Sequence, residues 1–226
     1  MKKLLKYFTP FEYILWLSSL TLATVSHFAY EGDVMKLFAS LIGITALIFC
    51  AKGNPAGQAL IIVFSLFYGY ISYTFSYYGE MMTYLGMSAP MAVWALVAWC
   101  KNPYEKGRAE VKVNTLSGRE WLFAVILTIV VTLVFCPVLY LLNTNNLVFS
   151  TISVTTSFLA VYLTARRSPY YALAYAANDV VLIVLWVSAS LHDPSYLGVV
   201  ICFAAFLAND VYGFTNWMRM KKRQGS

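Results

Sequence analysis

The chain is divided into apolar runs of about 20 residues by short polar breaks, and this pattern constrains its fold more than any other feature. The hydrocarbon core of a bilayer is about 30 Å thick, and about 20 residues of α-helix cross it. The sequence therefore predicts eight membrane-spanning helices, at about residues 12–30, 34–51, 57–77, 81–100, 120–142, 146–164, 168–190 and 195–218. With 60% hydrophobic and only 12% charged residues, we expect an all-α integral membrane protein.

The basic residues test this division independently, because lysine and arginine concentrate in cytoplasmic loops. Of the 16 lysines and arginines, all but Lys36 precede the first predicted span, lie in alternate loops or follow the last span. The pattern predicts a multi-pass protein with both termini in the cytoplasm. The net charge of +6 is therefore interpreted as orienting the chain in the lipid bilayer, and nucleic acid is not expected as a partner.

Two parts of the sequence are similar in the order of their features. The segments "CAKGNP" (50–55) and "TARRSP" (164–169) each lead from a helix end through basic residues to a proline. The pair of spans after each segment ends in a tryptophan, Trp99 or Trp217, just before a basic edge. These features indicate an internal repeat of three helices.

The repeat defines the expected organisation of the chain. An odd number of helices would invert the second unit, and a single linker helix restores its orientation, giving two parallel repeats as in known transporters. We predict five regions: an N-terminal tail and extra helix (1–33), a first three-helix repeat (34–100), a basic cytoplasmic loop with a linker helix (101–145), a second three-helix repeat (146–218) and a basic cytoplasmic tail (219–226).

Polar residues interrupt two of the predicted spans near their centres. The run "YYALAYAANDVVLIVLW" contains Asn178 and Asp179, and "FLANDVYGFTNW" contains Asn209 and Asp210. At 1.5 Å per residue both pairs lie about 15 Å from the cytoplasmic edge, close to the bilayer midplane. Ionisable residues at this depth are costly and by default face a pathway or a partner.

We interpret these residues as part of a pocket of amides and aromatic rings for a small polar aromatic ligand. Two structural alternatives stand beside this interpretation: the amides pack helices together, or Asp210 pairs with an arginine at the cytoplasmic edge. In the first repeat each candidate is balanced against plain packing. Besides the two asparagine–aspartate pairs, the candidates are Trp186, Tyr212, Trp94, Gln58, Ser65 and Tyr68.

Other motifs narrow the function by their absence from the sequence. There is no P-loop, and the two histidines are too far apart in the sequence to suggest a catalytic or H-E-x-x-H site. The four cysteines are scattered, so neither a metal site nor a disulfide framework is expected, and no cofactor is predicted. An enzyme and an ATP-driven pump are both poorly supported. Pro90 lies inside a predicted span and is expected to kink it and free backbone carbonyls.

The segments "KGNP" (52–55), "YYGEMM" (77–82), "YYALAYAANDVVLIVLW" (170–186) and "FLANDVYGFTNW" (206–217) resemble the PnuC transporters of bacteria. The resemblance covers about residues 34 to 220. It implies a SWEET-like arrangement of 3+1+3 helices in the bacterial inner membrane. It also implies uptake of nicotinamide riboside by facilitated diffusion, with a separate cytoplasmic kinase that traps the substrate, and assembly as a homotrimer.

The family's pocket uses tryptophan, asparagine and glutamine side chains, which we place here at Asn178, Trp186, Asn209 and Trp94. Met91 and Ala92 follow Pro90 where a glutamine is expected in the family. This departure keeps thiamine, riboflavin and deoxynucleosides open as substrates. A non-transporting substrate-binding subunit of a larger complex is the alternative from a different class of protein.

Overall fold

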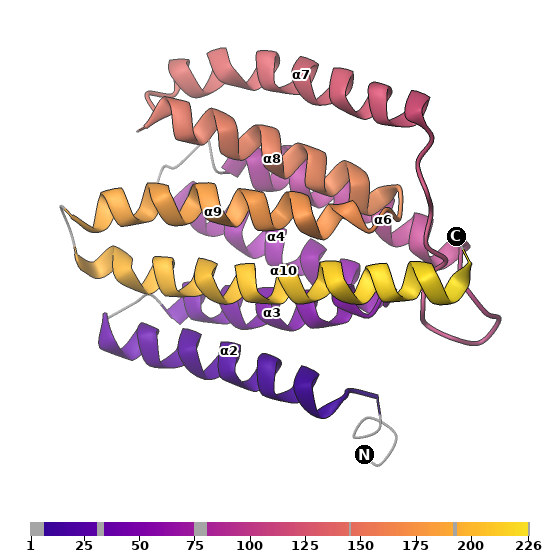
Figure 1. The fold of residues 1–226 in the computed structure, drawn as a ribbon. Helices are drawn as coiled ribbons and strands as arrows, with labels where there is room; N and C mark the ends of the chain where they lie inside the picture. The colour runs from indigo at the N-terminus through magenta and orange to yellow at the C-terminus, as the bar shows by residue number, and fades with distance from the viewer. Residues whose placement is uncertain (1–6, 31–33, 75–80, 145, 192–193, 226) are drawn as a thin grey trace.

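The computed structural model describes residues 7–30, 34–74, 81–144, 146–191 and 194–225, and eight long helices lie within them (Figure 1). Residues 77–80 of the "YYGEMM" segment fall outside the described residues. The helices are α2 (Pro10–Ala29), α3 (Val34–Ala51), α4 (Pro55–Thr74), η1 (Thr83–Ser88) continuing as α6 (Ala89–Lys101), α7 (Gly118–Leu141), α8 (Leu147–Ala165), α9 (Tyr170–Ser190) and α10 (Leu197–Gln224).

Among the described helices, seven are long and apolar enough to cross a membrane, and they correspond to the second to eighth predicted spans. The remaining helix, α2, has 20 residues but carries glutamate, histidine and several serines and threonines. These residues lower its apolar character, so its path through the membrane stays a prediction. The all-α membrane fold itself is confirmed.

Local sequence signals explain where the helices begin and end. A capping box starts α2, in which Thr9 and Glu12 satisfy each other's backbone N–H groups, and Ser117 with Glu120 starts α7 in the same way. After α3 the chain turns at Gly53, with a φ of 64°, and α4 begins at Pro55. After α8 it turns at Arg167, with a φ of 58°, shortly before α9. The two "basic residue to proline" segments therefore form similar turns.

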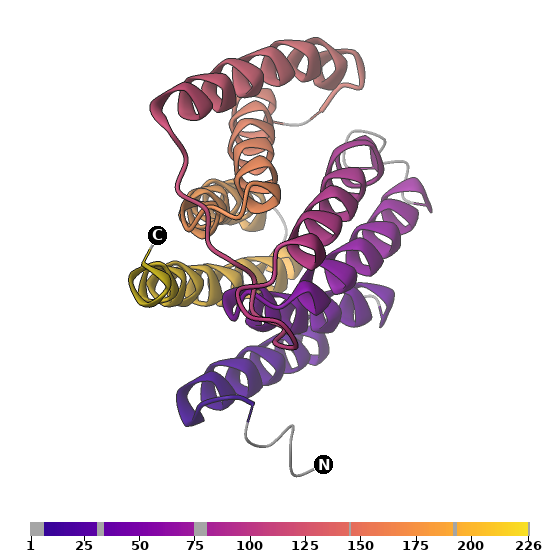
Figure 2. The ribbon, with the colours of Figure 1, turned by 90° about the vertical axis from the view of Figure 1, so that its right-hand side faces the viewer.

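Six of the helices form a closed ring (Figure 2). Around the ring, α3 packs on α4, α4 on η1 and α6, these on α8, α8 on α9, α9 on α10, and α10 on α3. The first helix of each three-helix unit thus contacts the third helix of the other unit. Two parallel units that face each other across a pseudo-two-fold axis have this order of contacts.

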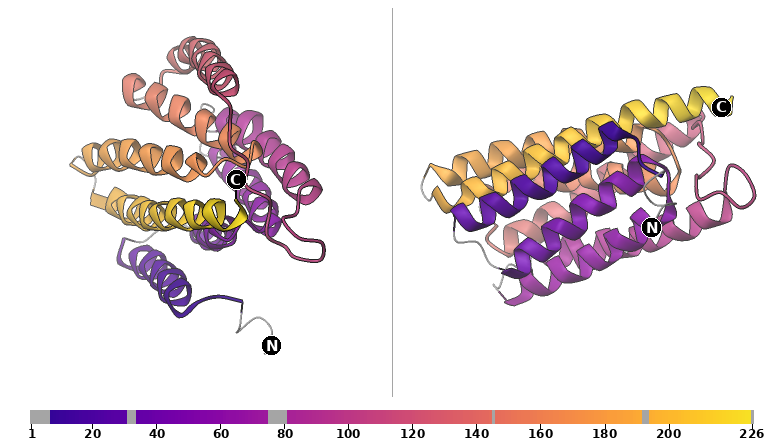
Figure 3. Two further views of the ribbon diagram at one scale, coloured as in Figure 1. Left: turned by 45° about the vertical axis from the view of Figure 1, so that its right-hand side comes forward. Right: turned by 90° about the horizontal axis from the view of Figure 1, so that it is seen from below.

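Two helices lie outside the ring, at opposite edges of the bundle (Figures 1 and 2). The linker helix α7 packs against α8, and α2 runs along α3 and α10 (Figure 3). The start of α2 and the end of α10 lie at the same end of the bundle (Figure 1). The α3–α4 and α8–α9 turns and residues 102–117 also lie at this end. We call it the basic end, because these segments carry many of the lysines and arginines of the chain.

The kink expected at Pro90 is preceded by a π-helical segment. In η1 the chain is wound more widely, and the N–H of Ala89 bonds to the carbonyl oxygen of Tyr84, five residues earlier. Proline lacks an N–H, so the regular bond pattern cannot continue through it, and a π-turn is one way to absorb the change. The last helix also departs from expectation. It continues to Gln224, through most of the predicted basic tail, and ends at Gly225 with a φ of 70°.

Candidate substrate path and its closed end

The two asparagine–aspartate pairs meet through their aspartates. Asp179 on α9 and Asp210 on α10 are 4% and 5% exposed, and their carboxyl groups lie close to each other. The second carboxyl oxygen of Asp179 (Oδ2) is buried without a hydrogen-bond partner. The prediction that both pairs lie at matching depth is consistent with this contact. The alternative in which Asp210 pairs with Arg166 or Arg167 does not occur: Arg166 pairs with Glu120, and the Arg167 guanidinium donates to the carbonyl oxygen of Lys112.

The asparagines of the two pairs point away from each other. The Asn178 side-chain oxygen accepts hydrogen bonds from the hydroxyls of Ser153 and Thr156 on α8, both at 2.9 Å. The Asn209 amide donates to Ser19 Oγ on α2 at 2.9 Å and to the carbonyl oxygen of Ala205. Neighbouring residues of a helix point about 100° apart, so a pair that meets through its aspartates turns its amides outward. Both asparagines therefore act in helix packing in this structure.

The predicted aromatic candidates do not join the aspartate pair. Trp186 packs on Tyr196 at the end opposite the basic end, with a ring distance of 5.2 Å. Trp94 is 43% exposed and lies against Tyr162 of α8. Tyr212 donates its hydroxyl to Glu12 of α2. These three side chains occupy separate places on the bundle.

The candidates of the first unit lie along α4. Gln58 is buried and donates to the sulfur of Cys50. Ser65 is 1% exposed, and its hydroxyl has no hydrogen-bond partner. The ring of Tyr68 packs on those of Phe64 and Tyr84, so this position is joined to the π-helical segment η1. Ser65 is therefore the residue of this set whose polar group is available to a ligand.

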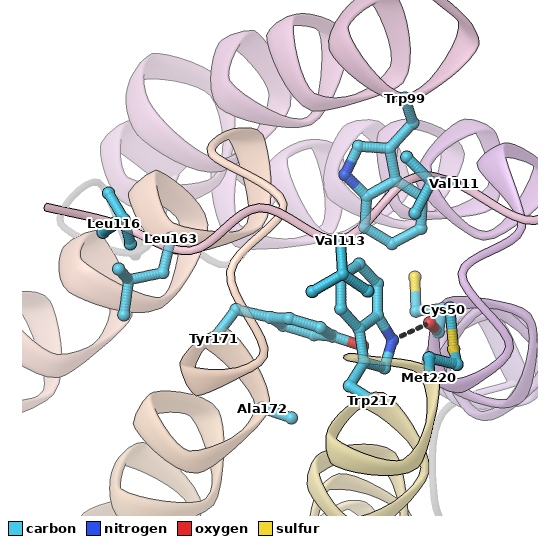
Figure 4. Close-up of a cluster of buried hydrophobic side chains, with 10 residues drawn as sticks. All are labelled: Cys50, Trp99, Val111, Val113, Leu116, Leu163, Tyr171, Ala172, Trp217 and Met220. Atoms are coloured by element: carbon cyan, nitrogen blue, oxygen red, sulfur yellow. Dashed lines mark hydrogen bonds between the residues drawn. The ribbon is translucent and has the colours of Figure 1, made fainter. Parts of the chain in front are cut away.

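At the basic end the ring is closed by two tryptophans whose role the sequence analysis did not predict (Figure 4). The indoles of Trp99 and Trp217 are fully buried and lie 5.3 Å apart. Trp99 on α6 donates its N–H to the carbonyl oxygen of Thr164 at the end of α8 (2.8 Å). Trp217 on α10 donates to that of Cys50 at the end of α3 (2.9 Å). Each unit thus holds the other through an equivalent bond, and we call these two bonds the tryptophan interlock.

Residues 102–117, which we call the strap, cover this closed end. Val111 is fully buried beside Trp99, and its N–H bonds to the carbonyl oxygen of Gly53 in the α3–α4 turn (Figure 4). Asn114 bonds through its N–H to the carbonyl oxygen of Arg167 in the α8–α9 turn. Burial, reinforced by the neighbouring guanidinium of Arg166, lowers the pKa of Arg167. The strap thus contacts both three-helix units.

A buried ion pair ties the extra helix α2 to the ring. Glu12 is 1% exposed, and its carboxylate accepts from Lys52 Nζ at 2.9 Å and from the Tyr212 hydroxyl at 2.7 Å. Lys52 also lies over the ring of Tyr7, 4.8 Å from its centroid. Three separate elements, α2, the α3–α4 turn and α10, therefore meet at one carboxylate.

A ring of two parallel three-helix units, with buried polar groups inside and one closed end, is the architecture of a secondary membrane transporter. Residues 33–219 match the family model described as nicotinamide mononucleotide transporter, and the chain belongs to this family. It is accordingly a membrane transporter and not an enzyme.

Individual relatives are similar to this chain over nearly its whole length. The nicotinamide riboside transporter PnuC of Neisseria mucosa is 29% identical over 220 residues, covering 95% of this chain and 83% of that protein. The PnuC of Haemophilus influenzae is 23% identical over 216 residues, covering 95% and 92%. A crystal structure of the vitamin B3 transporter PnuC matches with a TM-score of 0.81 at 27% identity, covering 96% of this chain and 94% of that one. The resemblance to PnuC is confirmed.

Proposed function

We propose that this chain takes up nicotinamide riboside across the bacterial inner membrane by facilitated diffusion. The observation that carries the proposal is the likeness to PnuC, at a TM-score of 0.81 over 96% of the chain. Two curated relatives similar over 95% of the chain are both named as nicotinamide riboside transporters. The substrate would pass inside the ring, and the two units would rock against each other to open one end at a time.

The buried carboxyls support a ligand that carries positive charge. Nicotinamide riboside has a pyridinium ring, and a cation in a site of low polarity is stabilised by a nearby carboxylate. Asp179 and Asp210 supply such a group near the middle of the bundle, and Ser65 supplies a hydroxyl without a partner. Thiamine is also a cation, whereas riboflavin is neutral, so charge favours the first two ligands over the third.

The direction of uptake would be set outside the transporter. The sequence contains no nucleotide-binding motif, so a cytoplasmic kinase that phosphorylates the riboside would keep its free concentration low. We place both termini in the cytoplasm, because lysines and arginines concentrate at the basic end. The homotrimer implied by the PnuC resemblance is part of the same proposal.

Calorimetry on the purified protein tests the choice of substrate. Nicotinamide riboside, nicotinamide mononucleotide, thiamine, riboflavin and a deoxynucleoside are titrated in turn under the same conditions. Micromolar or tighter binding of the riboside alone is the expected result, because the mononucleotide brings a phosphate toward the carboxyl pair. Binding of another of these ligands in its place would reassign the substrate, and heats indistinguishable from dilution for all five would refute the vitamin assignment.

A further inference from the structure

A cavity of about 230 Å³ lies at the basic end, where α6, the strap and the α8–α9 turn meet. It is lined by Trp94 of α6, by Asn102 and Asn114 of the strap, and by Arg166 and Arg167 of the turn. We propose that this cavity binds the phosphate of an anionic phospholipid, and that the bound lipid holds the basic end closed. The binding is independent of the substrate, whereas the effect on closure rests on the proposed rocking of the two units.

The lining of the cavity is positively charged and has an unused donor. It contains two arginines and, among the described residues, no carboxylate. Arg166 pairs with Glu120 through Nη2, but its Nε–H is buried without a hydrogen-bond partner. Burial and the neighbouring charge of Arg166 lower the pKa of Arg167. A phosphate would bring acceptor oxygens to the arginines and offset the repulsion between them.

The turn keeps a charged side chain at the cavity in spite of an unfavourable backbone conformation. Arg167 has a φ of 58°, in the left-handed region, and Gly53 has a φ of 64° in the corresponding α3–α4 turn. Glycine adopts this region freely, whereas a residue with a side chain is strained there. Such strain is common at ligand sites, and here it places a guanidinium in the cavity wall.

Trp94 shows that the cavity faces the outside of the ring. The buried Trp99 points into the closed cluster, and Trp94 lies five residues earlier, about 140° around α6. Trp94 is 43% exposed, and the exposed Val93 and Val97 lie beside it on the helix. Asn102 follows Trp94 by eight residues, which places the indole about 12 Å further into the membrane. A phospholipid has this shape, with its phosphate at the helix end and its acyl chains along the apolar face.

The two arginines lie at the level of the lipid headgroups. They follow directly on the last residue of α8. Close by, Trp121 of α7 packs on Tyr170 of α9, with a ring distance of 5.6 Å, and such aromatic residues concentrate at the membrane–water interface. Basic pockets between helices on the cytoplasmic side bind anionic headgroups. A soluble phosphate ester would use the arginines but would leave the exposed indole uncovered, so the arrangement favours a lipid.

A ligand in the cavity would join the two three-helix units. Trp94 belongs to the first unit, the two arginines belong to the second, and Asn114 belongs to the strap that contacts both. The Asn114 side chain already donates to the carbonyl oxygen of Arg166 at 3.1 Å. The interlock bond of Trp99 joins the same two helices, α6 and α8. A lipid bound beside this bond would therefore reinforce the interlock.

Native mass spectrometry of the delipidated protein in detergent tests the binding. The wild-type chain should retain a single phosphatidylglycerol and should retain phosphatidylcholine, which has no net charge, less firmly. In Arg167→Gln the affinity for phosphatidylglycerol should fall about tenfold, the loss of a hydrogen bond to a charged group. The matched control is Lys222→Gln, which removes the same charge from an exposed position near the end of α10 and should leave the affinity unchanged.

A second variant and a soluble phosphate complete this test. Asn114→Asp puts a carboxylate of the same shape into the cavity and should also lower retention of phosphatidylglycerol. Equal retention by the wild type, Arg167→Gln and Asn114→Asp would overturn the site. Inorganic phosphate and nicotinamide mononucleotide are titrated by calorimetry. Saturable binding of either that is lost in Arg167→Gln, with lipid retention unchanged in this variant, would assign the cavity to a soluble phosphate and overturn the lipid.

The reactivity of Cys50 tests the closure in nanodiscs. Its thiol is 4% exposed in the cluster that contains the interlock tryptophans, and the other cysteines are replaced. A water-soluble thiol reagent should label Cys50 about fivefold more slowly in phosphatidylglycerol than in phosphatidylcholine, as for one added hydrogen bond. Arg167→Gln should abolish this difference, and equal rates for the wild type in the two lipids would overturn the closure. Neither experiment contains riboside, so their failure is distinct from a failure of the proposed uptake.

Discussion

The tryptophan interlock can be weakened one bond at a time. Trp217→Phe keeps an aromatic ring in the cluster but removes the N–H that bonds to the carbonyl oxygen of Cys50. Trp99→Phe does the same to the bond with Thr164. If these bonds hold the two units together at the basic end, each substitution should raise the population of the open state.

The size of this effect follows from the surroundings of the two acceptors. The carbonyl oxygen of Cys50 also accepts from the Gly53 N–H, and that of Thr164 also accepts from the Arg167 N–H. Neither oxygen is left unpaired by the substitution. Each substitution should therefore cost only the net free energy of one hydrogen bond, about 1 kcal/mol. That corresponds to about a fivefold rise in the open population for one substitution and about 30-fold for both.

The thiol of Cys50 reports on the opening. It is 4% exposed in the closed cluster, so a water-soluble thiol reagent should reach it when the basic end opens. The other cysteines, Cys100, Cys136 and Cys202, are replaced by serine or alanine so that one site is labelled. The labelling rate of Cys50 should rise about fivefold in Trp217→Phe and about 30-fold in the double variant.

Trp16→Phe is the matched control for this assay. Trp16 also donates an indole hydrogen bond, to Thr45 at 3.2 Å, but this bond joins α2 to α3 and does not cross between the units. Its loss should leave the labelling rate of Cys50 unchanged. An unchanged rate in the Trp99→Phe, Trp217→Phe double variant, with the thermal stability retained, would refute the interlock.

Three further substitutions test the packing of the bundle by thermal unfolding in detergent. Lys52→Met leaves the buried carboxylate of Glu12 without its cation and should cost about 3 kcal/mol, whereas an unchanged melting temperature would remove the ion pair as a link between α2 and the ring. Gly57→Ala would place its Cβ 2.6 Å from a sulfur and 2.7 Å from a backbone nitrogen of α3, and should cost about 1–3 kcal/mol, while Gly118→Ala, with no atom within 4 Å, should not. Asn209→Leu should lower the melting temperature through its lost bond to α2 and leave riboside affinity unchanged; a selective loss of affinity would return Asn209 to the pocket.

Much of the helical architecture could be predicted from the sequence, because it depends on properties that are local along the chain. Apolar runs long enough to span a bilayer produced α3, α4, α7, α8 and α9 close to their predicted bounds, and α10 close to its predicted start. The parallel repeat could be predicted from the similar sequences of the two segments that lead to Pro55 and Pro169. In the structure, each of these segments forms a turn through a residue with positive φ. The capping boxes of α2 and α7 likewise depend on residues only three positions apart in the sequence.

The facing of individual polar side chains could not be predicted in the same way. The sequence places Asn178 and Asp179 at the right depth, but which of the two faces the partner helix depends on the rotation of α9 against α8 and α10. A rotation of about 100° decides this, and the apolar residues are spread nearly evenly around α9. Both asparagines make contacts between helices in the structure, and their part in a ligand pocket stays a prediction.

The closed end was missed for a different reason. Its bonds join residues far apart in the sequence, as in the contact of Trp217 with Cys50, and the acceptors are backbone groups that leave no mark in the sequence. In the strap, Val111 and Val113 are apolar residues in a polar segment, and that alternation was the available signal. The tryptophans were noticed because of their position in the repeat, but only the three-dimensional structure shows that they meet.

Uptake into sealed vesicles tests the central claim most directly. Purified protein is reconstituted into liposomes, and entry of labelled nicotinamide riboside is followed with and without a riboside kinase and ATP inside. We expect entry that stops at equal concentrations without the kinase and continues to accumulate labelled product with it. Accumulation of unmodified riboside above the outside concentration would contradict facilitated diffusion, and entry no faster than into protein-free liposomes would contradict riboside transport itself.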